Sequence, residues 1–386
     1  MSGFFHGVTT TLIDTGARTI SLPSSSIIGL CDTFTPGVLG GGTAKAGDLV
    51  LLTSEREAIA AFGADSAITK AAQAIYVRAK AVIVAVGVAK LEDAALQTSA
   101  IIGGVLASGQ RTGLQALLDG KSKHNAQPKL IIAPKHSATQ AVATAMDALA
   151  AKLRAIAIID GPNTTDEAAL AYAEEFGSKR LYLVDPGVKY WDTTTSATVD
   201  APGSAWAAGM FAWTDATYGY WASPSNKELV GITGTSRPIE YLDGDDTCRA
   251  NLLNNANITT IIRDDGFRLW GNRTLSSDQK WAFLCVVRTA DMINESILVN
   301  HLWAVDRGIT KNYVTDVTEG VNAYLRSLVN KGAILGGECW IDPDLNTADQ
   351  IAQGNIYFDF DFTPVYPAEH ITFRSHLVND YITEIF

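Results

Sequence analysis

The sequence predicts an α/β protein with more than one domain, of the α+β multidomain kind. Between residues 50 and 190, short continuous apolar runs alternate with helical patterns, which is typical of a mostly parallel sheet covered by helices. The last third is arranged differently, with two long helical patterns and a few short strands. Both chain ends have the composition of extended β segments. A length of 386 residues also favours two or three domains.

The first half of the chain contains the clearest element signals. After an opening rich in β-forming residues, a strand is predicted over 24–30 and a glycine-rich loop over 36–47. Ser54 and Glu57 form a capping box that starts a helix, and Gly63 ends it. The other elements expected up to residue 190 are helices over 67–80 and 137–153, a helix capped by Thr164 and Glu167, and strands over 81–88, 129–133, 156–159 and 181–184.

The second half begins with a connection rich in proline, glycine and serine, over residues 186–244. Four tryptophans within it predict a packed segment and not a disordered linker. A long helix is then expected over 278–305, and the spacing from Val314 to Val329 predicts a second amphipathic helix that ends at Gly332. The strands expected in this half are 258–263, 267–270, a half-buried one over 356–362, and a last one over 371–378 beyond Pro364 and Pro367.

Composition favours protein partners and argues against other classes. Charged residues make up only 18% of the chain, against roughly 25% in ordinary soluble proteins, while apolar residues make up 47%. We therefore expect partner chains to cover much of the surface. A net charge of −11 argues against nucleic acid. No apolar run reaches the roughly 20 residues that span a bilayer, and the first residues lack a secretory signal, so neither membrane insertion nor export by that route is expected.

No catalytic, cofactor or metal site is predicted. Gly120-Lys121-Ser122 resembles the end of a phosphate-binding loop, but the first glycine of that motif and its preceding strand are missing. Asp342, Asp344 and Asn346 alternate as in a calcium loop, without its turn glycine or closing glutamate. The six histidines show no metal-ligand spacing. The cysteines are far apart and are expected to be buried thiols of a chain made in a reducing cytoplasm: Cys31, Cys248, Cys285 and Cys339.

The outward face of the second amphipathic helix allows two interpretations. It carries Thr318, Asn322, Arg326 and Asn330, with Lys331 beside them. Such a face is either solvated or a docking surface for an acidic partner, with its cations at the helix end where the dipole also favours them.

Three segments carry a resemblance to a known family. They are IIRDDGFRLWGNRT at 261–274, HLWAVD at 301–306 and IYFDFDFTP at 356–364. Together they resemble the tail sheath proteins of contractile phages. The likeness covers nearly the whole chain and is closest to the sheaths of R-type pyocins and of myophages with similarly short subunits.

The resemblance implies the tail-sheath fold and a structural function without catalysis. Residues 1–25 and 245–386 would form a core domain, and residues 26–244 an inserted outer α/β domain. Copies would polymerise as stacked hexameric rings around an inner tube and contract, without nucleotide hydrolysis, to drive the tube through a target cell envelope. The partners would be further copies, the inner tail tube protein, and baseplate and tail-terminator proteins. The subunit would be made in the bacterial cytoplasm and released in a phage tail or pyocin particle on lysis.

The resemblance also assigns positions, and two alternatives stay open. An N-terminal arm that joins sheets of neighbouring subunits falls on Val8, Thr9, Thr10, Thr11, Leu12 and Ile13. A C-terminal arm of the same kind falls on Ile371, Thr372, Phe373, Arg374, Ser375, His376, Leu377 and Val378. The tube-holding helix falls on Asn322, Arg326, Asn330 and Lys331, which favours docking over solvation. The alternatives are the sheath of a type VI-like secretion or extracellular injection system, and an enzyme built on the α/β module.

Overall fold

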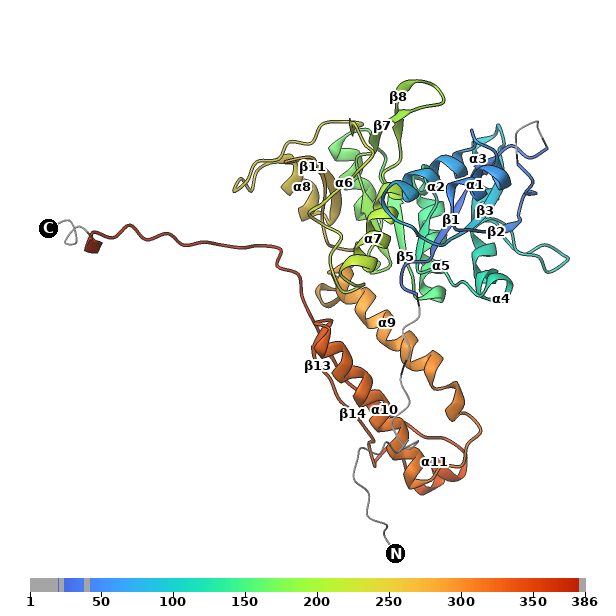
Figure 1. The fold of residues 1–386 in the computed structure, drawn as a ribbon, viewed down its shortest axis with the longest axis vertical. Coiled ribbons are helices and arrows are strands. Elements are labelled where there is room, and N and C mark those ends of the chain that lie inside the picture. The colour runs from blue at the N-terminus through green and yellow to red at the C-terminus, as the bar shows by residue number, and fades with distance from the viewer. Residues whose placement is uncertain (1–19, 21–23, 38–41, 382–386) are drawn as a thin grey trace, which may run out of the picture.

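Two bodies make up the structure, a computed structural model that describes residues 20, 24–37 and 42–381 (Figure 1). The larger body is organised by a nine-stranded sheet in the order β2-β3-β1-β4-β5-β6-β11-β12-β9. Its strands are β1 (Ile28–Phe34), β2 (Leu49–Leu52), β3 (Ile83–Ala89), β4 (Leu130–Ile132), β5 (Ile156–Asp160), β6 (Leu181–Val184), β9 (Lys227–Glu228), β11 (Ile258–Arg263) and β12 (Phe267–Trp270).

The sheet has a parallel centre and antiparallel edges. Strands β3, β1, β4, β5, β6 and β11 pair in parallel, and β2, β12 and β9 are antiparallel to their neighbours. Successive residues pack into two separate cores: Ile156 and Ile158 into one, Ala157 and Ile159 into the other. The predicted parallel sheet with helical cover is confirmed. The first core takes in α1 (Glu55–Phe62), α2 (Ala67–Arg78) and α7 (Ser204–Thr217), and the second α3 (Ala94–Ile102), α5 (Gln140–Leu153), α6 (Asp166–Glu174) and α8 (Arg249–Asn255).

Side-chain caps begin α1 and α6, the two helices for which the sequence predicts a capping box. The Ser54 hydroxyl accepts a hydrogen bond from the backbone N–H of Glu57, and Gly63, at a φ of 84°, ends α1 as predicted. At α6 the capping residue is Thr165 and not the predicted Thr164, because the Thr165 hydroxyl is the one that accepts from the N–H of Ala168. The spacing of Thr164 and Glu167 fits a capping box and so favours Thr164, and only the backbone conformation selects Thr165.

The tryptophan-rich connection packs against the larger body, as predicted. Trp206 is buried in the first core and Trp213 lies against it. The connection also supplies a three-stranded sheet made of β10 (Gly234–Thr235), β7 (Val188–Asp192) and β8 (Ala197–Ala201). The short helices of this body are η1 (Gly113–Asp119), α4 (Gly120–His124) and η2 (His136–Ala138).

The smaller body is built on two long helices that share a core, α9 (Leu284–Asn300) and α10 (Lys311–Asn330). The helix predicted over 278–305 is divided, because Ala282 and Leu284 form backbone hydrogen bonds with Thr274 and Asn272 instead of continuing one helix. The remaining elements are η3 (Gln279–Trp281), η4 (Leu302–Ala304), α11 (Ala348–Ala352), and a ribbon in which β13 (Ile334–Gly336) pairs with β16 (Thr363–Pro364) and β14 (Cys339–Trp340) with β15 (Asp359–Phe360).

The boundary between the two bodies differs from the predicted division at residue 245. Strand β11 pairs with β6, and β12 pairs with β11 and β9, so residues 258–270 lie in the sheet of the larger body. The resemblance implied a core domain that begins before these strands. Strand β11 is apolar and buried, and such a strand belongs in the interior of a sheet, here beside β6.

Ion pairs join α9 to the larger body along one side of the helix. Arg288 contacts Asp215 with two hydrogen bonds of 2.7 and 2.5 Å, and both side chains are buried. Asp291 pairs with Arg180 in the same two-bonded way. Glu295 lies 3.0 Å from the Arg154 guanidinium and 3.5 Å from the Lys129 ammonium. Spacings of three and four residues place all three positions on one helix face, so the bodies are joined by a continuous ionic seam.

Candidate assembly surfaces

The C-terminal segment extends away from both bodies (Figure 1). All residues from 368 to 381 are exposed, and no strand is formed over 371–378 within the described chain. The predicted strand is therefore not formed within a single chain, and the predicted pairing with a neighbouring subunit stays a prediction. A β-strand needs a partner that satisfies its backbone groups, and along this segment the same chain provides no sheet edge.

The same segment exposes large apolar side chains at alternate positions. Ile371 is 67% exposed, Phe373 92% and Leu377 101%. Because side chains alternate across an extended backbone, these three share one side, while Thr372 and Arg374 lie on the other. Large apolar groups gathered in water mark an interaction surface, so the segment has the side-chain pattern of a half-buried strand without its sheet.

The root of this segment is tied to the body by two contacts. The Glu369 carboxylate accepts two hydrogen bonds from the Arg273 guanidinium, at 2.7 and 2.6 Å. The ring of Tyr366 meets the ring of Phe283 edge to face, 6.1 Å apart. Both members of the ion pair are 39% exposed, so solvent screens it and its contribution to stability is small.

Helix α10 presents a narrower outward face than the sequence predicts. The Asn322 amide accepts from the N–H of Cys339 at 2.7 Å and donates to its carbonyl at 3.0 Å, which ties β14 to the helix. The hydroxyl of Thr318 is also buried. Asn322 therefore anchors the ribbon and is not available as a docking residue. Helix periodicity places these two positions next to the face that carries Arg326, and only the fold shows on which side the ribbon lies.

The exposed side chains of α10 carry both signs of charge. Arg326, Asn330 and Lys331 are exposed, as expected of a docking surface. Glu319 is exposed as well, and its carboxylate lies 3.7 Å from the Arg326 guanidinium. Arg326 and Lys331 thus lie at the C-terminal end of the helix, whereas Lys311 and the carboxylates of Asp316 and Glu319 lie nearer its start.

The N-terminal arm predicted at Val8 to Ile13 lies outside the described residues. Ile20 is described, and it packs against the core shared by α9 and α10. The chain therefore enters the larger body from the side of the smaller one.

Reactive groups are few in the part of the chain that the structure describes. All four cysteines are buried, and burial raises the pKa of the Cys339 and Cys285 thiols to about 11, so both are protonated at neutral pH. Among the described residues, no group of three or more histidine, cysteine, aspartate or glutamate side chains is placed to hold a metal ion. None of the described helices combines the length and the apolar character needed to cross a membrane.

Comparison with known proteins adds to this geometry. Residues 109–275 match the family described as phage tail sheath protein central domain, and residues 276–377 match the phage tail sheath C-terminal domain. The boundary between these matches coincides with the passage from the larger to the smaller body. In fold, the chain is similar to the contracted sheath of the PVC extracellular contractile injection system (TM-score 0.72, 18% identity, 98% of this chain and 99% of that one). It is also similar to the contracted helical sheath of the anti-feeding prophage (TM-score 0.73, 22% identity, 96% and 98%).

Sequence relatives agree over the full length. A prophage major tail sheath protein of Pseudomonas aeruginosa strain UCBPP-PA14 is 65% identical over 382 residues, which covers 99% of this chain and 98% of the relative. The tail sheath protein of Escherichia phage P2 is 34% identical and covers 100% and 98%. The resemblance found in the sequence is confirmed, and the chain belongs to the phage tail sheath protein family.

Proposed function

We propose that this chain is the subunit of a contractile sheath in a phage tail or a tail-derived bacteriocin of the R-type pyocin kind. Copies polymerise as stacked hexameric rings around an inner tail tube and contract without nucleotide hydrolysis. The α/β body serves as a structural domain and not as an enzyme. The observation that carries the proposal is the C-terminal segment, which leaves its own body in an extended form with its apolar side chains in water.

Residues 371–378 then act as a strand that is donated to a neighbouring copy. The two-stranded ribbon of β13 to β16 is the acceptor, because it offers backbone edges beside exposed Leu335 and Trp340. Burying Ile371, Phe373 and Leu377 contributes about 1.5–3 kcal/mol for each side chain. That gain recurs at every subunit and offsets the entropy lost on association. The N-terminal arm at residues 8–13 has the same role in the proposal.

Deleting the residues after Pro367 tests the strand donation. The shortened chain should keep both bodies, because the ion pairs of α9 all lie before that point. We expect sedimentation to show monomers and negative-stain microscopy to show no tubes, whereas the full chain forms tubes at the same concentration. Tubes of normal length from the shortened chain would refute the proposal.

Helix α10 is the proposed contact with the inner tube, through Arg326, Asn330 and Lys331. Their exposure and the positive charge at the end of the helix suit an acidic partner surface. The double variant R326E/K331E should still polymerise but should no longer co-assemble with its tube protein. Variant sheaths that retain the tube would assign the contact to another surface. Baseplate and tail-terminator proteins complete the proposed set of partners.

A sheath of a secretion or extracellular injection system is the second candidate, because the fold is shared with sheaths of that kind. Neighbouring genes separate the two: holin and lysin genes accompany a phage or a pyocin released on lysis, and an unfoldase ATPase accompanies secretion. Assembly in the bacterial cytoplasm is proposed in both cases.

A further inference from the structure

The larger body contains a cavity of about 780 Å³, and its lining includes no residue of α10 or of residues 371–378. It opens where β1, β3 and β4 end, and its lining includes Asp32, Lys90 and His136 from those strand ends. In the sheet β1 lies between β3 and β4, all three in parallel, with helices on both faces. Such a change of strand order leaves a crevice at the carboxyl ends of the strands, where α/β sheets bind ligands.

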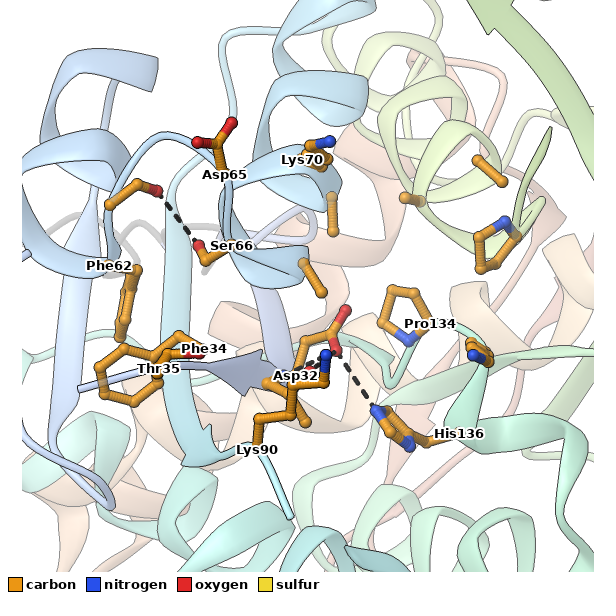
Figure 2. Close-up of a pocket in the computed structure, with 18 of the residues that line it drawn as sticks. Asp32, Phe34, Thr35, Phe62, Asp65, Ser66, Lys70, Lys90, Pro134 and His136 are labelled. Atoms are coloured by element: carbon orange, nitrogen blue, oxygen red, sulfur yellow. Dashed lines mark hydrogen bonds and ion pairs between the residues drawn. The ribbon is translucent and has the colours of Figure 1, made fainter. Parts of the chain in front are cut away.

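Hydrogen bonds with the surrounding backbone hold the charged groups at the base of the cavity in place. The Asp32 carboxylate accepts from the N–H of Thr33 at 2.7 Å and lies 3.3 Å from the His136 imidazole (Figure 2). The adjoining turn holds Lys135 at a φ of 64°, a conformation that is strained for a residue with a side chain. The buried Asp160 carboxylate fixes that turn by accepting from the N–H of Lys135 and the hydroxyl of Ser137.

Positive groups face the opening. Lys90 and Lys135 are exposed at its edge and, among the described residues, form no ion pair within the cavity. The first turn of α2, capped by Ser66, also lines the cavity, and a helix start favours negative charge. On the acidic side, the Asp32 carboxylate lies 3.3 Å from the His136 imidazole, and Asp65 and Asp200 are exposed to solvent, which screens their charges.

An unpartnered donor and an apolar wall complete the arrangement. Trp206 lines the cavity with only 6% of its surface exposed, and its indole N–H has no acceptor among the described residues. A buried donor without an acceptor is costly, so this group favours a ligand that brings an oxygen. Phe34 and Phe62 form an edge-to-face pair at one end of the cavity, with ring centres 5.3 Å apart (Figure 2).

We propose that this cavity binds a small organic anion. Its carboxylate or phosphate group meets Lys90, Lys135 and the first turn of α2, and its apolar body lies against Phe34, Phe62 and Trp206. The residues involved belong to the larger body and not to the arms or to α10, so this proposal does not rest on the proposed strand donation or tube contact.

Binding of two probes to the full chain tests the site: adenosine monophosphate, which carries a phosphate, and indole-3-acetate, which carries a carboxylate. The readouts are equilibrium dialysis and the 19F signal of 5-fluorotryptophan at position 206, assigned with W206F. We expect saturable binding of one probe, a shift of the Trp206 signal, and about tenfold weaker binding to K90A/K135A. The probe that binds identifies the anionic group.

The matched control is K121A/K123A, which removes two exposed lysines of α4 outside the cavity. It should bind as the unaltered chain does, and uncharged adenosine should not compete. Equal affinity in the two double variants, equal binding of adenosine, or no saturation of either probe by about 10 mM would overturn the proposal. Tube formation by K90A/K135A keeps this result separate from the proposed sheath function.

Discussion

Breaking the Arg288–Asp215 pair should destabilise the fold more than breaking any exposed ion pair among the described residues. Arg288 is 5% exposed and Asp215 2%, and the two share two hydrogen bonds. Asp215 also accepts from the hydroxyl of Ser25 at 2.7 Å, and Arg288 donates to the Ser25 carbonyl at 3.2 Å. The variant R288M leaves a buried carboxylate with the serine as its remaining side-chain partner. Removing one member of a buried pair costs about 3–5 kcal/mol, because the other charge stays desolvated.

The control is R326M on α10, where Arg326 is 64% exposed and lies 3.7 Å from Glu319. An exposed pair of this kind contributes about 0–1 kcal/mol. Both variants are compared by urea unfolding of the chain shortened at Pro367, followed by tryptophan fluorescence, so that polymerisation does not contribute. The double variant R288M/D215L should recover part of the loss, because it buries no unpaired charge. If R288M unfolds at the same urea concentration as R326M, the seam does not hold the two bodies together.

Three further predictions rest on other contacts. N322A should lower the free energy of unfolding by about 1–3 kcal/mol, because it leaves the N–H of buried Cys339 unpaired, whereas N330A at an exposed position should change it by less than about 0.5 kcal/mol. Burial raises the pKa of Asp160, so its ionisation costs stability: as pH rises from the ordinary aspartate pKa of about 3.9 through the raised value, the unaltered chain should lose stability relative to D160N, and parallel pH curves of the two would contradict this. F373S/L377S should abolish tubes in negative-stain images while T372S/H376S keeps them, and equal effects of both would exclude a donated strand with one apolar side.

The sequence predicted the larger body well because its signals are local. Continuous apolar runs, capping side chains and helix-ending glycines each act within a few residues, and β3, β5 and α1 lie within a few residues of their expected positions. The sequence was a poorer guide where the structure of an element depends on contacts with residues far away in the chain. The resemblance assigned β11 to the other domain, and no local signal indicates its pairing with β6, which lies more than seventy residues earlier in the chain, from 184 to 258. Helix 278–305 was divided by bonds to residues 272 and 274.

For the candidate surfaces, the sequence indicated positions along the chain but not which side chains are exposed. Resemblance to the family assigned an inter-subunit arm to residues 371–378 and a tube contact to α10. Both assignments stay predictions, and the resemblance did not show which α10 side chains are exposed. Asn322 lies four residues before Arg326, so helix periodicity places the two on neighbouring positions of one face. Only the position of β14 shows that the Asn322 amide is hydrogen-bonded to the backbone of Cys339. The cavity in the larger body had no sequence signal at all, because Asp32, Lys90 and His136 come from three separate strand ends and match no motif.

The strengths of these contacts indicate where a polymer of this chain could bend under the proposed function. Contraction requires each body to move while the donated strand stays paired. Two ion pairs of the α9 seam, Arg288–Asp215 and Arg180–Asp291, are two-bonded and largely buried, so separating the two bodies of one chain would cost several kcal/mol at each of them. The Arg273–Glu369 pair at the root of the arm is 39% exposed on both sides and costs about 1 kcal/mol or less to break. Residues 365–369 are therefore the weakest connection between body and arm, and the bodies should move as units about that point.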